Sequence, residues 1–408
     1  MEIKQPVFGK RLRNIRLRNR LAQADLAGGP ISTSYISRIE SGSRVPSEEA
    51  VRHVASKLGV SLEELLSTDN TDATMAEVST ALADHDFPTV IDLLQSYGPN
   101  LLERLPEGWA WQALWARFHA HSGTNDYAAQ SADLQQMVAL ARKWESPSLL
   151  SRLLIEMSKT ERTLGNIGGA LGAAREAHSV AIGLHSRSDV LMLKSWLALV
   201  TTETEAGLLP QASARIPDVL RAAETAASSL QAHAYWTCSS VRIRQGMFQE
   251  GKELIDRALA AMESRDDLLD WARLRVAAVS LHLRVPELVS PSIRTWLKEA
   301  ADAFHYVGQP IHHAELNAVA ARVDLTEGKL PEALAKAAAA EDTGLLAFHD
   351  RLRTRLLRAE VTIRMGQIEQ GLLLAQSVAE EADGSGYLDL AAEAWRTVAT
   401  SKNLPPAI

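Results

Sequence analysis

The side chains best suited to bind another molecule lie in the segment Leu21–Ser47. Thr33, Ser34 and Ser37 carry short hydroxyl groups, and Arg38 follows with a guanidinium group. On a helix these residues share a polar side, and both kinds of group form hydrogen bonds with phosphate oxygens and with base edges. A break containing glycine and proline precedes them. The segment therefore predicts two short helices around a tight turn, which is the outline of a helix-turn-helix that reads DNA.

A first helix before this segment is predicted from Phe8, Leu12 and Ile15, which recur at i, i+4 and i+7. Its opposite face is rich in arginine. Residues 1–68 carry 11 lysines and arginines against 7 acidic residues, whereas the rest of the chain carries 32 against 43. This asymmetry predicts that only a small N-terminal module contacts polyanions. The basic residues at the start of the module are Lys4, Lys10, Arg11, Arg13, Arg16, Arg18 and Arg20.

Four further helices complete the predicted module. A short second helix ends at Gly28-Gly29-Pro30, because glycine frees the backbone and proline cannot continue the helical hydrogen bonds. Ile36 and Ile39 turn the third helix into a small core. The four helices are expected over Gln23–Ala27, from an N-cap at Ser32 to Glu40, over Glu48–Leu58 and over Leu62–Leu66. We therefore predict a DNA-binding domain over residues 1–68, a linker over 69–73 and a second domain over 74–408.

The segment from about residue 8 to residue 66 resembles the Xre/Cro-type helix-turn-helix family of phage repressors and bacterial regulators. It carries Q-x-x-L-A before the turn, Y-I-S-x-I-E-x-G after it and R-x-P-S at the start of the next helix. Two features depart from the family pattern: Ala22 replaces the usual Ser or Thr cap, and the turn is one residue shorter. The alternative interpretation is a basic helical domain that contacts proteins.

The resemblance also implies roles for individual residues. The glutamine before the turn would contact a phosphate, the hydroxyl side chains would face base edges, and the two later arginines would lie beside the backbone or a base. In many members a helix-1 arginine pairs with the glutamate that ends the recognition helix, which predicts a contact between Arg16 and Glu40. The residues expected to bind DNA are Arg16, Gln23, Ser32, Thr33, Ser34, Tyr35, Ser37, Arg38 and Arg44.

The rest of the chain contains an internal repeat. Each clear copy has a glycine, four residues with an apolar side chain near the middle, and then alanine or glycine. Successive copies are nearly evenly spaced, except that the interval between Gly246 and Gly328 is about twice the others, which predicts a degenerate copy near residue 287. Asp84–Thr89 is predicted to be a first copy. The clear copies begin at Gly123, Gly165, Gly207, Gly246, Gly328 and Gly366.

These copies indicate helical hairpins. The glycine would end one helix and permit a tight turn, and the small residue five positions later would let the two helices pack closely. The signature resembles the tetratricopeptide repeat, in which G-[DN]-[YF]-x-x-A joins two helices. The resemblance implies an all-α, right-handed solenoid of about eight hairpins, closed by a final helix around Leu388–Ala399. The alternative is an irregular helical bundle.

In tetratricopeptide repeats the first helix of each hairpin lines a concave face. By that resemblance, inward positions lie near i−6, i−10 and i−13, where i is the turn glycine. Their mixture of cations, polar groups and one tryptophan would suit a short peptide, although each residue could instead belong to a solvated helix face. The expected ligand-binding residues are Arg152, Lys159, Lys194, Thr201, His233, Trp236, Ser240, Arg322, Arg353 and Glu360, and the rule also selects Glu315.

The sequence offers no recognisable catalytic chemistry. Gly246–Lys252 fits G-x-x-x-x-G-K, but Glu253 replaces the Ser or Thr that would hold magnesium. His312 and His313 are adjacent, so they point in different directions on a helix. The single cysteine, Cys238, excludes an intramolecular disulfide and a cysteine-based zinc site. We therefore expect no enzyme activity, no cofactor and no metal.

The two parts together resemble bacterial peptide-sensing regulators of the Rgg/PlcR/NprR type, which act as pheromone receptors in quorum sensing. The resemblance implies a homodimeric, sequence-specific transcriptional regulator. Its repeats would sense a ligand, expected to be a short peptide, or a partner, and would control binding to double-stranded operator DNA with two half-sites. No apolar stretch is long enough to span a membrane, and the N-terminus lacks a secretory signal, so we expect cytoplasmic localisation.

Two other functions are compatible with the same sequence. The chain could be a protein-interaction scaffold with constitutive DNA binding, in which the repeats recruit a partner protein. It could also be a silencing partner for a linked toxin or protease gene. The direction of regulation, the operator and the ligand do not follow from the residues.

Overall fold

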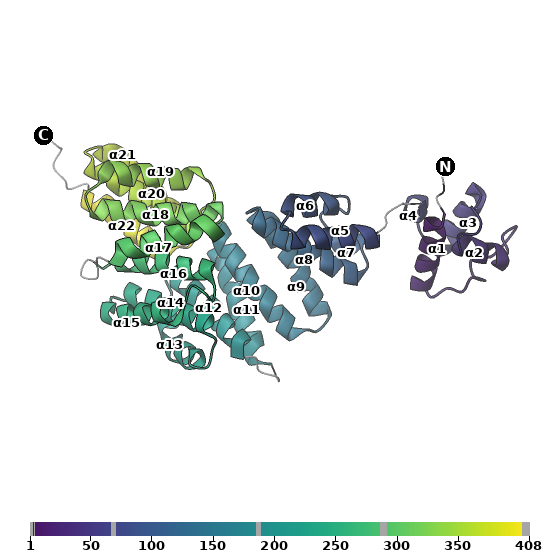
Figure 1. Cartoon of the computed structure of the whole chain (residues 1–408), viewed down its shortest axis with the longest axis horizontal. Coiled ribbons are helices and arrows are strands. Elements are labelled where there is room, and N and C mark those ends of the chain that lie inside the picture. Colours follow the sequence, from purple (N-terminus) through teal and green to yellow (C-terminus); the bar gives the residue numbers. More distant parts are fainter. Residues whose placement is uncertain (1–2, 4, 67–70, 185–188, 286–291, 402–408) are drawn as a thin grey trace. The chain divides into compact units, whose positions relative to one another are not determined.

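The computed structural model describes residue 3 and residues 5–66, 71–184, 189–285 and 292–401 (Figure 1). These residues form helices joined by turns, with one isolated bridge between Gly28 and Ile31 and no strand. The chain divides into two compact units, Met1–Thr80 and Ala81–Ile408, and the boundary falls within helix α5. None of the helices in these ranges is long and apolar enough to cross a bilayer.

The N-terminal unit is built around a small apolar core. Its helices are α1 (Val7–Arg18), α2 (Thr33–Glu40), α3 (Glu48–Leu58), α4 (Leu62–Leu66) and the greater part of α5 (Thr71–Ala83). Phe8 and Leu12 of α1 pack with Ile36 and Ile39 of α2. Gly9 permits this close approach, because a Cβ there would lie 2.0 Å from the Ile39 carbonyl oxygen. The apolar register predicted for these two helices is therefore the observed one.

The segment Gln23–Ala27, predicted to form the second helix, is not helical. Residues 23–26 form turns, in which the Asp25 and Ala27 amides donate to the carbonyls three residues earlier. Ala22 has no side chain that could cap a helix, and its amide instead donates to the Asp25 carboxylate at 2.6 Å. Gly28 and Gly29 then take positive φ angles. The segment before the turn is therefore too short and too poorly capped to complete an α-helix.

The predicted linker is also shorter than expected. Positions 69 and 70 lie outside the described residues, but residues 71–73 form the first turn of α5. Asp72 lies in that turn, where a negative charge stabilises the positive end of the helix dipole.

The second unit is a stack of helical hairpins. After α6 (Phe87–Gln95) and the short α7 (Leu101–Arg104), each hairpin joins an even-numbered helix to the odd-numbered helix that follows it. The even-numbered helices α10 to α22 also contact one another in order, so they form an inner layer. The helices are α8 (Glu107–Gly123), α9 (Tyr127–Lys143), α10 (Pro147–Leu164), α11 (Ile167–Ile182), α12 (Asp189–Glu205), α13 (Leu209–Ala223), α14 (Ser228–Arg244), α15 (Phe248–Ala261), α16 (Leu268–His282), α17 (Ser292–Val307), α18 (Pro310–Thr326), α19 (Leu330–Asp342), α20 (Phe348–Arg364), α21 (Ile368–Gly384) and α22 (Leu388–Ser401).

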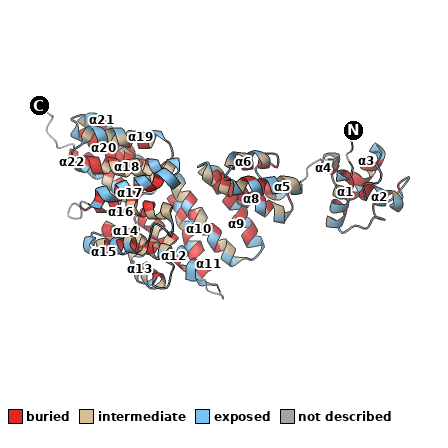
Figure 2. Ribbon diagram, in the orientation of Figure 1, coloured by how far each residue is buried: buried red, intermediate tan, exposed pale blue. Residues whose placement is uncertain are grey.

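This arrangement confirms the predicted all-α, tetratricopeptide-like repeat with a final helix. Buried residues are concentrated on the faces that paired helices turn toward one another (Figure 2). The turn predicted near residue 287 lies outside the described residues, but α16 and α17 are found on either side of it.

One repeat turn lies two positions later than predicted. Gly165, Gly207, Gly246, Gly328 and Gly366 all have positive φ, as the predicted turn requires. In the hairpin α8–α9, however, Asn125 takes that conformation, with φ of 60°, and Gly123 does not. Gly123 is needed for another reason, since a Cβ there would lie 2.1 Å from the Phe87 ring. Likewise Ala128 is exposed, whereas Gln130, five positions after Asn125, is buried.

The stack also closes on itself through contacts that span most of its length. Tyr387, just before α22, is fully buried, and its hydroxyl donates to the Arg162 carbonyl at 3.1 Å. Ile167 and Ala206, at the turns after α10 and α12, share an apolar cluster with Leu352 of α20. Helix α20 also contacts α10 directly. The C-terminal hairpins thus pack against turns that lie much earlier in the chain.

Close helix packing at the small position of a repeat can be tested at Gly371. A Cβ there would lie 2.8 Å from the Ala359 carbonyl oxygen, so we expect Gly371→Ala to lower the free energy of unfolding by about 1–3 kcal/mol. Gly172 in α11 is the matched control, because nothing lies within 4 Å of a Cβ there. Gly172→Ala should raise stability by up to about 1 kcal/mol. Equal urea midpoints for the two variants would contradict the packing argument.

Candidate functional site

The orientation of α2 is fixed by a buried ion pair. Arg16 of α1 donates to both oxygens of Glu40, with Nε–Oε1 at 2.6 Å and Nη2–Oε2 at 2.9 Å. Its third nitrogen donates to the Leu21 carbonyl at 2.8 Å. Gln23 donates its amide to the same Glu40 carboxylate at 2.8 Å. The predicted contact between Arg16 and Glu40 is therefore present, and it links α1, the turn and the end of α2.

The pair also changes the acid-base properties of its members. Burial disfavours the charged form of Glu40, but the hydrogen bonds from Arg16 and Gln23 outweigh it and hold the pKa of Glu40 below its ordinary value. The hydrogen bond to Glu40 raises the pKa of Arg16. Both groups are therefore charged at neutral pH.

The outer side of α2 is polar. Ser32, Thr33, Ser34, Ser37 and Arg38 are exposed, whereas Ile36 and Ile39 are buried. Ser32 caps the helix, since its side chain accepts from the Tyr35 amide at 3.2 Å. The structure therefore presents the predicted recognition residues on one free surface.

The loop after α2 is held against the helix. The Arg44 guanidinium carbon lies 4.9 Å from the centre of the Tyr35 ring. The Tyr35 hydroxyl accepts from the Ser47 amide at 3.3 Å, and the Arg38 carbonyl accepts from the Ser43 hydroxyl at 3.1 Å. Tyr35 therefore supports Arg44, which remains exposed beside α2.

The predicted ligand-binding residues lie on helices of the inner layer, and several already have partners. Arg322 pairs with Glu360 at 2.8 Å, so two of these residues bind each other. His233 Nε2 lies 3.5 Å from Asp270, and Lys159 donates to Glu156 at 2.8 Å. Arg353 lies 3.3 Å from Glu393 of α22.

The remaining predicted residues differ in exposure. Arg152 and Lys194 are exposed, and neither forms an ion pair within the described part of the chain. Thr201, Trp236 and Ser240 are half-buried.

The charge of Arg273, on α16, acts on titratable groups of three other helices. Burial, together with the charge of Arg273, lowers the pKa of His312 on α18 to about 4. Burial and the nearby Asp350 raise the pKa of Glu315 to about 7, and Arg273 opposes that rise. The same guanidinium influences Tyr127 of α9 and His233 of α14. Titratable groups on α9, α14 and α18 are therefore all within the electrostatic influence of Arg273.

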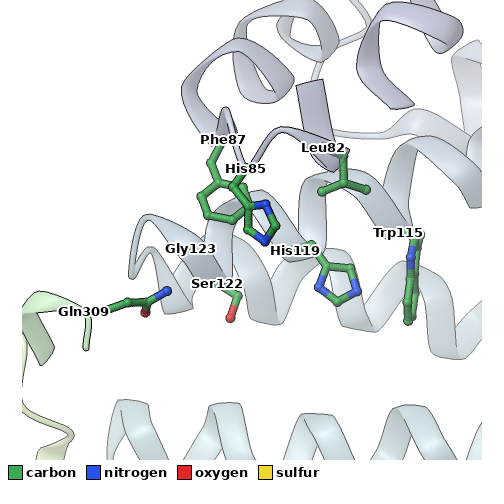
Figure 3. Close-up of a pocket in the computed structure, with 8 residues that line it drawn as sticks. All are labelled: Leu82, His85, Phe87, Trp115, His119, Ser122, Gly123 and Gln309. Carbon is green, nitrogen blue, oxygen red and sulfur yellow. The ribbon is translucent and has the colours of Figure 1, made fainter. Parts of the chain in front are cut away.

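A pocket in the second unit is lined by Phe87 and His85, which face Trp115 and His119 of α8 (Figure 3). The Trp115 and His119 rings are in edge contact, with centres 4.4 Å apart. Burial lowers the pKa of His119, so its imidazole is neutral near pH 7. The pocket is therefore suited to an uncharged, aromatic or apolar side chain. Its lining is completed by Leu82, Ser122, Gly123 and Gln309.

The sequence contains a signal for this pocket, but the prediction of the turn at Gly123 conceals it. When Asn125 replaces Gly123 as the turn residue i, the positions i−6 and i−10 are His119 and Trp115. The inward-position rule therefore selects two pocket residues once the turn is placed correctly.

Comparisons with known proteins agree with both parts of the fold. Residues 7–67 match a family model described as a helix-turn-helix domain. The chain therefore carries an N-terminal helix-turn-helix domain, followed by a tetratricopeptide-like helical body. No curated protein matches it.

Several solved structures are similar to the chain at low sequence identity. A Rap protein complexed with Competence and Sporulation Factor is 10% identical, with 97% of each chain covered and a TM-score of 0.51. The apo quorum sensor NprR from Bacillus thuringiensis is 11% identical, with 97% of this chain and 98% of that chain covered and a TM-score of 0.47. PlcR from Bacillus thuringiensis, in complex with the peptide PapR7 and DNA, is 14% identical, with coverage of 77% and 98% and a TM-score of 0.38. At 10% identity the likeness to the Rap protein shows the fold alone.

The buried ion pair can be tested by Arg16→Ala. The substitution leaves Glu40 buried without its bidentate partner, so we expect the free energy of unfolding of the N-terminal unit to fall by about 3 kcal/mol. Because the pKa of Glu40 is depressed in the folded state, its contribution should be lost as pH falls below about 4. Arg52→Ala, which breaks an exposed pair with Glu48, should leave the urea midpoint nearly unchanged. Similar urea midpoints for both variants would contradict the assigned role.

Glu315 should make stability depend on pH in the opposite sense. Its pKa is raised to about 7 in the folded state, so ionisation between about pH 4.5 and 7 disfavours folding. We expect Glu315→Gln to match the unmodified protein at pH 4 and to exceed its stability at pH 8 by about 1–2 kcal/mol. The exposed Glu332 serves as control, and Glu332→Gln should leave the pH profile of thermal unfolding nearly unchanged. A parallel profile for Glu315→Gln would contradict the burial argument.

Proposed function

We propose that this chain is a sequence-specific, DNA-binding transcriptional regulator whose repeat body binds a short peptide and thereby controls binding to an operator. The observation that supports DNA binding most directly is the polar outer side of α2. Thr33, Ser34, Ser37 and Arg38 are exposed together, while the buried Arg16–Glu40 pair fixes the helix beneath them. This is the arrangement that a recognition helix needs in order to enter a major groove.

Within this proposal the residues of the module have different tasks. The hydroxyl groups of Thr33, Ser34 and Ser37 contact base edges, and Arg38 contacts a base or the backbone. Arg44, supported by the Tyr35 ring, contacts a phosphate. Gln23 uses one amide hydrogen for Glu40 and has a second hydrogen for a phosphate. Short hydroxyl side chains discriminate weakly between bases, so phosphate contacts supply much of the affinity.

The inner layer supports a peptide as the ligand class. A peptide carries charged ends, backbone hydrogen-bonding groups and side chains of mixed polarity. The exposed cations Arg152 and Lys194 and the charged groups around Arg273 match the first two features. The pocket of Trp115 and His119 matches an apolar or aromatic side chain. Arg322 and Glu360, which pair with each other, do not bind the peptide in this proposal. They hold the neighbouring helices α18 and α20 together.

We expect the protein to act as a homodimer in the cytoplasm. The spacing of its two helix-turn-helix modules then provides a way to regulate operator binding. Two helix-turn-helix modules must match half-sites about 34 Å apart, so a small rotation of one module changes operator affinity. A ligand that contacts several hairpins at once favours one curvature of the repeat stack over another. The proposed division of labour assigns DNA binding to residues 1–68 and sensing and dimerisation to residues 74–408.

Arg38→Gln tests the assignment of the recognition helix. We expect it to weaken binding to DNA from upstream of its own gene by about tenfold or more, because one charge-assisted contact is lost. The measurement is fluorescence anisotropy with the full chain, across a salt series and against scrambled DNA. Arg175→Gln, the same change on the exposed face of α11, should bind as the unmodified protein does. Equal affinity for both variants, or equal binding to both DNAs, would refute the proposal.

A further inference from the structure

The region where the stack closes contains a cluster of arginines around helix α22. Asp389 and Glu393 lie one turn apart on α22. Arg244, at the end of α14, forms an ion pair with Asp389. Arg353 of α20 lies 3.8 Å from Asp389 and 3.3 Å from Glu393. The two carboxylates of this face are therefore already engaged by two arginines.

A third arginine of this cluster, Arg284, follows α16. Its side chain forms no ion pair or hydrogen bond with the described part of the chain, and the residue is only half-exposed. The positive charge of Arg353, burial and the charge of Arg244 depress the pKa of Arg284 well below its ordinary value, and Asp389 and Glu393 offset this only in part. Arginine nevertheless remains protonated in proteins, so this charge is only partly compensated among these groups.

Several buried atoms of the cluster also lack hydrogen-bond partners among the described residues. The Arg244 side chain is only 9% exposed, yet its Nε has no acceptor. Arg353 Nη2 has no acceptor within hydrogen-bond distance, and Asp389 Oδ1 has no donor. Buried polar groups are almost always satisfied in folded proteins by protein groups, ordered water or ligands, so two unmet donors and one unmet acceptor at one place mark a candidate binding position.

The neighbouring carboxylates do not supply acceptors for these unpaired arginine nitrogens. Glu205 is held by Arg162, with Nε–Oε2 at 2.9 Å. Asp350 lies 3.5 Å from His349 on its own helix. These carboxylates therefore have cationic or hydrogen-bonding neighbours of their own.

We propose that Arg244, Arg284 and Arg353 form a site for a tetrahedral oxyanion, such as the phosphate group of a small molecule or inorganic phosphate. Guanidinium groups match the geometry and charge of phosphate oxygens. Arg244 and Arg353 meet at Asp389 from two different helices, and Arg284, after a third helix, is electrostatically coupled to both. The unmatched Asp389 oxygen would accept from a hydroxyl group, which hydrogen phosphate or an adjacent ligand hydroxyl supplies. The cluster is partly open to solvent, since the side chains of Arg353 and Asp389 are 18% and 21% exposed.

The role of this site would differ from that of the proposed peptide-binding surface, because it would stabilise the closure of the stack. It joins the ends of α14 and α16 to α20 and α22, and α20 and α22 are the elements that close the stack. An anion bound there would replace mutual repulsion among arginines by attraction, and would stabilise the closed arrangement. This inference does not depend on DNA or peptide binding. The anion site can therefore be refuted while the proposed function holds, and the proposed function can be refuted while the anion site holds.

The test uses Arg284→Gln in the full chain, because no described contact of that side chain is lost and its removal should leave the fold intact. In buffer without oxyanions the variant should unfold at the same temperature as the unmodified protein or higher, since one repulsive charge is gone. Saturating inorganic phosphate should raise the Tm of the unmodified protein by about 2–4 °C. The variant should lose that rise, and Arg175→Gln, a matched change on α11, should keep it.

Calorimetric titrations with inorganic phosphate, glycerol phosphate and acetate, at constant ionic strength, identify the ligand. Saturable binding of either phosphate compound that Arg284→Gln abolishes supports the site, and the tighter of the two shows whether free or esterified phosphate is preferred. Non-saturable effects of equal size in all three proteins would mean general salt stabilisation only, and would overturn the proposal. Acetate binding as tight as phosphate binding would overturn the tetrahedral assignment.

Discussion

An isolated helical hairpin leaves one apolar face uncovered, and most of this chain is organised by that constraint. Each hairpin covers the face of its neighbour, and the left-handed residue between its two helices sets how the next helix begins. At most turns that residue is glycine, but His85 and Asn125 serve the same purpose near the beginning of the stack. The end of the array would normally remain uncovered, and here α20 and α22 fold back onto the turns after α10 and α12. The body is therefore a stack whose last hairpins cap its own middle.

The N-terminal unit meets a different constraint, because a helix as short as α2 cannot hold its own orientation. Three contacts compensate: the Ser32 cap at its start, the two isoleucines in the core and the Arg16–Glu40 pair at its end. Apart from the Ser32 cap, none of them uses the outer side of the helix. That side thus carries the hydroxyl groups of Thr33, Ser34 and Ser37, which form no hydrogen bond within the described residues. The contacts that hold α2 and the groups proposed to bind DNA therefore lie on different faces of one short helix.

Features that are periodic or local can be predicted from this sequence. The apolar spacing around Leu12 and Ile36 and the repeating glycines predict most helices and the repeat class. The helix predicted over Gln23–Ala27 does not form, because Ala22 cannot cap it. The turn predicted at Gly123 lies at Asn125, because Gly123 is required for contact with Phe87 and not for the turn. The pocket of His119 and Trp115 follows from the sequence only when that turn is placed correctly. The closure through Tyr387 and the arginine cluster could not be predicted, since contacts between residues 225 positions apart leave no periodic trace.

The closure has a consequence for how such a protein can evolve. Open repeat arrays commonly gain or lose whole units, because each unit touches only its neighbours. Here several hairpins separate α10 from α20, and the hydroxyl of Tyr387 must still reach the carbonyl of Arg162. Duplicating or deleting one intervening hairpin would carry Tyr387 past its partner and uncover Ile167 and Ala206. The number of repeats between these two helices is therefore fixed, and lineages of this protein should diverge by substitution within hairpins, or by additions before α10, but not by changes in the count between.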